Sequence, residues 1–107
     1  MNRYIAQGLA ADLVGGKPIL FVGELQADAR EALKQTNVLL IEADLPHRTV
    51  RANGEERIEH PSGGLIRFIS GRSQSAARGF SFDIVVLPSH SDSEPYRPTL
   101  PSEWIRV

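Results

Sequence analysis

The sequence predicts a small α/β domain built on a mixed sheet. Three short apolar runs lack alternating polar residues, which is typical of strands covered on both faces: 18–22, 38–41 and 82–87. Two segments with apolar residues at helical spacing precede and separate the first two runs, and this order implies parallel crossover connections. The segment 48–70 alternates apolar and polar residues instead, which indicates an antiparallel meander.

The first half of the chain supplies the predicted helices. Residues 2–14 are expected to form a helix because apolar residues recur every four positions, and the glycines at 15–16 can end it. A second helix is expected at 26–36, where alanine and leucine share one face. The runs 18–22 and 38–41 then become the first two strands of the sheet, each following a helix.

The meander is predicted from its turns. Asn53-Gly54 is a strong tight-turn signal, so residues 49–51 are expected to pair back on residues 56–59. A second turn leads into a strand at 65–69. Four arginines on these strands could form a basic face: Arg48, Arg51, Arg57 and Arg67. Three glutamates are interleaved with them, so pairing between neighbouring strands is the simpler interpretation: Glu55, Glu56 and Glu59.

The last third combines one more strand with a proline-rich end. Residues 73–78 are expected to form one helical turn before the buried strand at 82–87. Four of the seven prolines follow that strand. We therefore expect a domain at 1–90 and a C-terminal extension at 91–107 that packs on or beside it, with Trp104 and Ile105 holding its end.

Composition narrows the class of protein. A chain of 107 residues is one domain, and a net charge of −1 creates no bulk field toward nucleic acid or membrane. Without cysteine there is neither a disulfide framework nor thiolate chemistry. No apolar run approaches the roughly 20 residues of a spanning helix, and the first residues lack the pattern of a signal peptide. We expect a cytoplasmic protein with no membrane partner and no cofactor.

One stretch resembles a known family. SAARGFSFDIVVL (75–87), together with PILFVGELQADAREALKQ (18–35) and the turn between Ile58 and Phe68, resembles the P-loop ATPase core of phage terminase large subunits and, more loosely, of superfamily 2 helicases. The matching positions are Ile58, Ser62, Gly63, Ile66, Phe68, Arg78, Gly79 and Asp83. The resemblance implies a truncated RecA-like sheet with two main helices and an antiparallel meander.

The departures from that family remove its chemistry. There is no glycine-rich loop feeding the N-terminus of a helix, because Gly15-Gly16-Lys17 follows the first helix and would present a helix C-terminus. In the family, two acidic residues bind magnesium and position the attacking water. Pro88 and Ser89 stand at those two positions in this sequence. The resemblance therefore implies a pseudo-ATPase that does not hydrolyse ATP.

Two groups of residues are candidates for a site. A ligand- or phosphate-binding loop could be formed by Gly63, Arg72, Ser75, Arg78 and Gly79, although Arg78 could equally bond the turn itself. The strand ends could gather an acidic cleft from Glu24, Glu42, Asp44 and His90, although solvated strand ends explain the same charges.

Two other groups of residues are weaker candidates for a catalytic or metal site. Ser89, His90 and Asp92 are too close in an extended segment to form a relay, since neighbouring side chains point apart. The three histidines lack the spacing of metal ligands, and no metal site is predicted.

Binding is the remaining function. In the family that the chain resembles, the strand before the phosphate-binding loop lies at the centre of the sheet. Without that strand, a neighbouring strand would be left with an unpaired edge. We expect the chain to reorder its strands, to cover the open edge with its C-terminal extension, or to pair with another chain. The sequence thus predicts a non-catalytic accessory protein of phage or prophage type. Its partners would be a second copy, a DNA-handling motor or nucleic acid; a small metal- or nucleotide-dependent enzyme, or half of a split ATPase, is the alternative.

Overall fold

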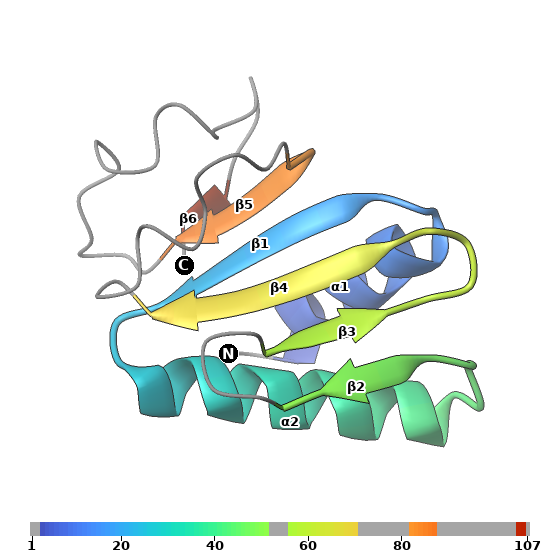
Figure 1. Cartoon of the computed structure of the whole chain (residues 1–107), viewed down its shortest axis with the longest axis horizontal. Coiled ribbons are helices and arrows are strands. Elements are labelled where there is room, and N and C mark those ends of the chain that lie inside the picture. Colours follow the sequence, from blue (N-terminus) through green and yellow to red (C-terminus); the bar gives the residue numbers. More distant parts are fainter. Residues whose placement is uncertain (1–2, 52–55, 71–81, 88–104, 107) are drawn as a thin grey trace.

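The computed structural model describes residues 3–51, 56–70, 82–87 and 105–106. These ranges contain two helices and six strands (Figure 1). In chain order the elements are α1 (Arg3–Val14), β1 (Pro18–Gly23), α2 (Gln26–Glu42), β2 (Arg48–Val50), β3 (Arg57–Glu59), β4 (Leu65–Ser70), β5 (Ile84–Leu87) and β6 (Ile105–Arg106).

All the described strands belong to one mixed sheet in the order β2-β3-β4-β1-β5-β6. The central strand β1 runs parallel to β4 on one side and to β5 on the other, and β6 runs parallel to β5. β2, β3 and β4 form an antiparallel meander. The predicted α/β class, mixed sheet, two helices and meander are therefore confirmed, whereas a RecA-like identity remains an expectation from the resemblance.

The predicted strand at 38–41 is wrong, because these residues form the last turns of α2. Leu40 is fully buried while Val38 and Ile41 are 44% and 62% exposed, which is the spacing of a helix with one covered face. Thr36 fits inside the helix by donating its hydroxyl to the carbonyl of Ala32 at 2.8 Å. A run of four apolar residues is too short to distinguish the two structures by periodicity.

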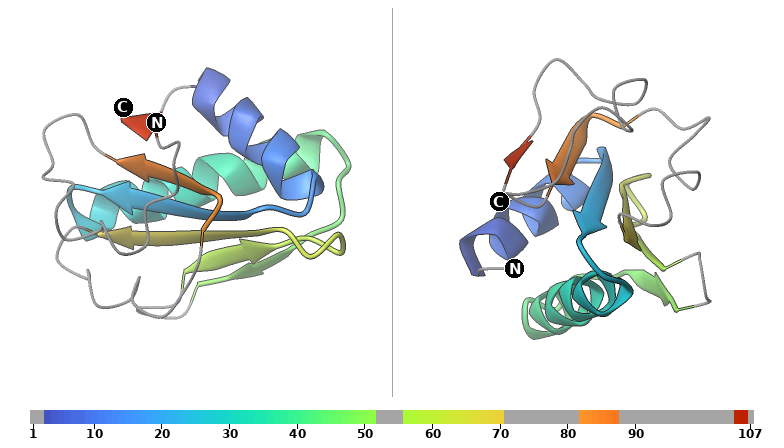
Figure 2. Two further views of the ribbon diagram at one scale, coloured as in Figure 1. Left: turned by 90° about the horizontal axis from the view of Figure 1, so that it is seen from above. Right: turned by 90° about the vertical axis from the view of Figure 1, so that its left-hand side faces the viewer.

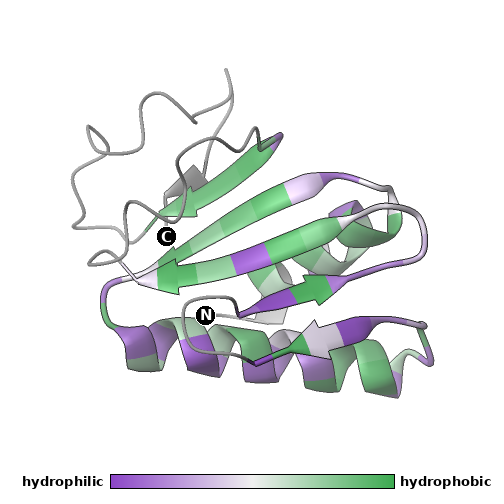
Figure 3. Ribbon diagram, in the orientation of Figure 1, coloured by the Kyte–Doolittle hydropathy of each residue, from purple (hydrophilic) through white to green (hydrophobic). Residues whose placement is uncertain are grey.

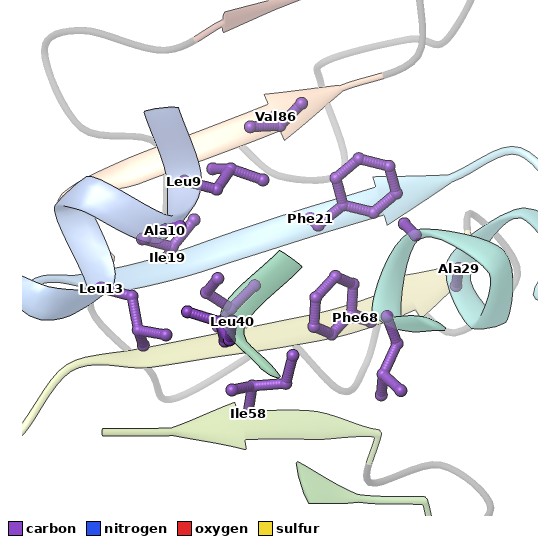
Figure 4. Close-up of a cluster of buried hydrophobic side chains, with 13 residues drawn as sticks. Leu9, Ala10, Leu13, Ile19, Phe21, Ala29, Leu40, Ile58, Phe68 and Val86 are labelled. Carbon is purple, nitrogen blue, oxygen red and sulfur yellow. The ribbon is translucent and has the colours of Figure 1, made fainter. Parts of the chain in front are cut away.

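Both helices lie on one side of the sheet, as the end-on view in Figure 2 shows. Their apolar faces meet the strands in the main core (Figure 4). The core residues are Leu9, Ala10 and Leu13 of α1, Ala29, Ala32, Leu33 and Leu40 of α2, and Ile19, Phe21, Ile58, Ile66, Phe68 and Val86 of the sheet. Phe21 and Phe68 pack at the centre with ring centroids 5.8 Å apart.

Both helices end in the same left-handed motif. In α1 the N–H groups of Gly16 and Lys17 donate to the carbonyls of Leu13 and Asp12. In α2 the N–H groups of Asp44 and Leu45 donate to Ile41 and Leu40 in the same way. The residue in the left-handed position is Gly16 in α1 (φ 84°) but Asp44 in α2 (φ 55°).

The turn between β3 and β4 packs on the end of α1. The hydroxyl of Ser62 donates to the carbonyl of Leu13 at 3.0 Å. Gly64 is buried, and a Cβ at this position would overlap the carbonyl oxygen of Leu13. The close approach fixes where β4 begins relative to the first helix.

The opposite face of the sheet has its own buried cluster, formed by Leu20, Val22, Ile69, Phe82, Val85 and Leu87. β1 is paired on both sides, so the sheet has no unpaired strand position at its centre. Ile105 pairs with Val86, which places the end of the predicted C-terminal extension on the edge of β5. The predicted helical turn at 73–78, Trp104 and the rest of the extension lie outside the described residues.

Candidate binding surface on the β2–β3 hairpin

Strand alternation divides the arginines of the meander between two faces. Ile58 lies in the core beneath the sheet, and Thr49, directly opposite it on β2, donates its hydroxyl to Asn37 of α2. Their neighbours on each strand must face the other way. Arg48, Arg57 and Arg67 therefore share the face that points away from the helices, and Arg57 stands directly opposite Arg67.

Glu59 is the acidic partner on that outer face. It pairs with Arg48 in the register of β2 and β3, and its carboxylate accepts a hydrogen bond from Arg57 Nε at 2.8 Å. The hydrogen bond from Arg57 lowers the pKa of Glu59 most; desolvation opposes it, and the charges of Arg57 and Arg48 lower it further. The direct partner of Glu59 is thus on its own strand, whereas Arg48 of the neighbouring strand stands opposite it and adds its charge.

The helix-facing side of the hairpin borders a groove of about 620 Å³ between the hairpin and α2. This volume is in the range of small-ligand sites. The lining residues are Ala27, Arg30, Glu31, Leu33, Lys34, Asn37 and Val38 of α2 and Arg51 and Glu56 of the hairpin.

Glu56 closes one end of this groove. Its side chain is only 4% exposed, and its carboxylate accepts a hydrogen bond from Gln26 Nε2 at 2.9 Å and lies 3.7 Å from Arg30 Nε. Both partners are on α2, so pairing between neighbouring strands is a wrong prediction for Glu56, and Glu55 lies outside the described residues. A buried carboxylate needs such partners because water cannot solvate it there.

Asn37 fastens the hairpin to the other half of α2. Its Oδ1 accepts the hydroxyl of Thr49 at 2.9 Å and lies 2.7 Å from Nε2 of His47. His47 Nδ1 also lies 2.8 Å from the carbonyl of Leu45. The hairpin is thus attached to α2 at two points, with the groove between them.

The side chains of the hairpin and of the adjacent side of α2 together carry more positive than negative charge. We call this set of side chains the hairpin surface. Its basic members are Arg30, Lys34, Arg48, Arg51, Arg57 and Arg67. Its acidic members are Glu31, Glu56 and Glu59. Two of these acids are already engaged with arginine, whereas within the described ranges Lys34 and Arg51 form no ion pair.

The residues predicted as a phosphate-binding loop are described only in part. Gly63 lies in the turn between β3 and β4 in a left-handed conformation, with φ of 96°. Arg72, Ser75, Arg78 and Gly79 lie outside the described residues.

The alternative acidic cluster is not brought together by the fold. Glu24 lies two residues before the start of α2, whereas Glu42 and Asp44 lie at its far end. A helix of 17 residues is about 25 Å long, so these carboxylates cannot share a ligand. The prediction was wrong because it placed Glu42 and Asp44 after a strand. His90 lies outside the described residues.

Sequence reasoning missed the contribution of α2. Gln26, Arg30, Lys34 and Asn37 recur at intervals of three and four residues, which places them on one side of the helix. That spacing was a signal for a polar helix face. Nothing in the sequence indicated that the hairpin would lie against it.

Comparisons of the chain with protein-family models, with curated proteins and with solved structures found no match. Across the described ranges, no three His, Cys, Asp or Glu side chains gather closely enough to hold a metal ion. None of the helices there combines the length and apolar character that a bilayer crossing requires.

Proposed function

We propose that this chain is a non-catalytic accessory protein that binds nucleic acid through its hairpin surface. The observation that carries the proposal is the concentration of six basic and three acidic side chains among the described residues around one hairpin, in a chain whose net charge is −1. The rest of the chain must therefore carry a negative balance. A local excess of this kind attracts a polyanion to one side of the molecule.

Phosphodiester backbones suit this surface better than a single small anion. Arg48, Arg57 and Arg67 share the outer face of the hairpin, so a backbone lying along that face can meet more than one guanidinium group. Arginine also matches phosphate oxygens with two parallel hydrogen bonds. The resemblance to the ATPase core of DNA-packaging motors supports the same ligand class, and it suggests a cytoplasmic phage or prophage setting.

The enzymatic alternative has no geometric support in the described residues. Its carboxylates are separated by the length of α2. A role as half of a split ATPase would need groups from another chain, and no contact described above favours it.

The test is a titration of fluorescently labelled single- and double-stranded DNA with the protein at several salt concentrations, followed by anisotropy. The variant Arg48→Gln/Arg51→Gln removes one exposed guanidinium from each face of the hairpin. We expect weaker binding on every DNA sequence and a salt slope reduced by about 1.5, since each lost phosphate contact removes roughly 0.7–0.9.

Lys17→Gln is the matched control. Lys17 is also exposed and basic, but it pairs with Asp12 at the end of α1 and does not line the groove. Its affinity for DNA should equal that of the wild type. Absence of DNA binding by the wild type at low salt, or equal losses in both variants, would overturn the proposal.

A further inference from the structure

The outer side of α2 carries apolar side chains that no described element covers. Among the described residues, the exposed large hydrophobic side chains are Val14, Leu25, Val38 and Ile41. Three of these lie on α2 or on the residue that caps its start. Figure 3 shows hydrophobic and hydrophilic residues mixed along this helix, which borders the molecule in that view.

These side chains belong to a regular stripe. Exposed positions follow one another along α2 at intervals of four and three residues: Ala27, Glu31, Lys34, Val38 and Ile41. We call this set the outer stripe. All of them except Ile41 also line the groove beside the hairpin, so a partner seated on this side of α2 would also cover Lys34 of the hairpin surface. Spacing of this kind keeps side chains on one line of a helix and is typical of the seam between two paired helices.

The charges on the outer stripe are self-complementary in one arrangement. Consider two antiparallel α2 helices related by a two-fold axis that passes between residues 32 and 33. Glu31 of each copy then faces Lys34 of the other copy. In the same register Ala27 faces Val38 of the second copy, and Ile41 reaches the residues that precede the helix, where Leu25 is 53% exposed.

The neighbouring antiparallel registers and the parallel pair bring like charges together. A shift of one turn places either Lys34 against Lys34 or Glu31 against Glu31. A parallel pair would oppose both residues with themselves. Because like charges at a helix seam are destabilising, the charges favour the antiparallel register over those arrangements.

We propose that this chain forms a homodimer through antiparallel packing of α2 along the outer stripe. The interface is isologous, as expected for a two-fold dimer. A pair of helices about 25 Å long covers less surface than the roughly 1,600 Å² of a standard interface. An interface of this size is typical of a weak dimer that forms reversibly as the protein concentration rises. The following tests distinguish this self-association from the binding of a different protein to α2.

Sedimentation velocity between low micromolar and millimolar protein tests the association. The wild type should pass from monomer to dimer as the concentration rises. Val38→Ser/Ile41→Ser should remain monomeric at every concentration, and because both side chains are exposed its fold should be retained, as circular dichroism will show. Val14→Ser, which removes an exposed apolar side chain outside the outer stripe, should dimerise like the wild type. A wild type that stays monomeric up to millimolar concentration would overturn the proposal.

Charge reversal tests the register. Glu31→Lys and Lys34→Glu should each weaken the dimer at least about tenfold, because each puts like charges together, and the double variant should restore the affinity. A restored double variant is not expected if α2 merely contacts an unrelated surface. Failure of the double variant to recover would count against the antiparallel pairing.

Cross-linking gives a second readout. The chain has no cysteine, so Ala27→Cys/Val38→Cys provides the sole thiols. These positions are about 16 Å apart within one helix, which excludes an internal disulfide. Oxidation should join two copies through position 27 of one and 38 of the other. Ala27→Cys alone should not cross-link in this register, and efficient cross-linking of that single variant would contradict it.

Discussion

Gly64 is held in place by the backbone of a different element. It lies at the start of β4, where a Cβ would overlap the carbonyl oxygen of Leu13. That carbonyl already accepts the hydroxyl of Ser62 and the N–H of Gly16, so it cannot easily move away. The end of α1 and the turn before β4 are therefore packed backbone against backbone.

We expect Gly64→Ala to lower the free energy of unfolding by at least about 2 kcal/mol, because either α1 or β4 must shift to admit the methyl group. Urea denaturation measures this change. Gly8→Ala is the control of opposite sign. Gly8 lies inside α1 with nothing within 4 Å of an added Cβ, so alanine should raise stability by about 0.5–1 kcal/mol. Equal effects of the two substitutions would contradict this packing.

Asp44 occupies a backbone conformation that favours glycine. Its φ is 55°, and its N–H completes the left-handed end of α2. We expect Asp44→Gly to stabilise the protein by about 0.5–1 kcal/mol. Gly16→Asp places the reverse change in the equivalent motif of α1 and should destabilise by about 1 kcal/mol. The midpoints of urea denaturation should move in opposite directions, and movement in the same direction would refute the comparison.

The length of α2 shows what local sequence could not decide. Residues 26–36 were correctly predicted as helical, but the apolar run that follows matches both a buried strand and a helix end. No glycine or proline stands between Thr36 and Pro46 to end the helix. Helical continuation exposes Val38 and Ile41, so the apolar character of the run reflects the outer stripe as well as the core.

The hairpin was predicted better than the groove beside it. The turn signal at Asn53-Gly54 and the alternation of 48–70 gave the direction and pairing of β2, β3 and β4. The partners of Glu56 come from α2, which is separated from it by the whole of β2. Alternation can divide side chains between two faces, but it does not say which element covers each face.

The Glu59 pair makes the hairpin sensitive to acid. Its pKa is below the ordinary 4.5 because Arg57 hydrogen-bonds the charged carboxylate. A lowered folded pKa stabilises the fold above the ordinary value, and this contribution is lost as the pH falls below about 4.5 and through the folded pKa. Glu59→Gln should be slightly less stable than the wild type at pH 6, because water screens this exposed pair, and the two should converge as the pH falls through the folded pKa. Urea denaturation across this range measures the difference, and a constant gap would disprove the linkage.

The whole sheet depends on strands that are far apart in the chain. The sequence predicted parallel strands and a meander, but it did not predict that β1 would lie between β4 and β5. Strand order arises from long-range packing, because Ile19 and Phe21 share one core with Phe68 and Val86. The same limit applies to the hairpin surface, which combines α2 with two strands that follow it.

β6 protects one edge of the sheet. Ile105 and Arg106 pair with Val86 and Leu87, so their removal would leave β5 with an open side. Deletion of residues 105–107 should lower stability by about 1–2 kcal/mol and increase aggregation on heating, whereas deletion of residue 107 alone should not. Thermal unfolding with light scattering measures both effects. An unchanged midpoint and scattering would show that β5 does not need this cover.

The position of β1 also governs when the protein can fold during its synthesis. The second edge of β1 is covered only when β5 has been synthesised, because Ile19 pairs with Ile84, roughly 65 positions later in the chain. Contacts of such high sequence separation slow folding, and a ribosome-bound chain would carry an uncovered central strand until β5 leaves the exit tunnel. Nascent chains that stop before β5 should therefore depend on chaperones.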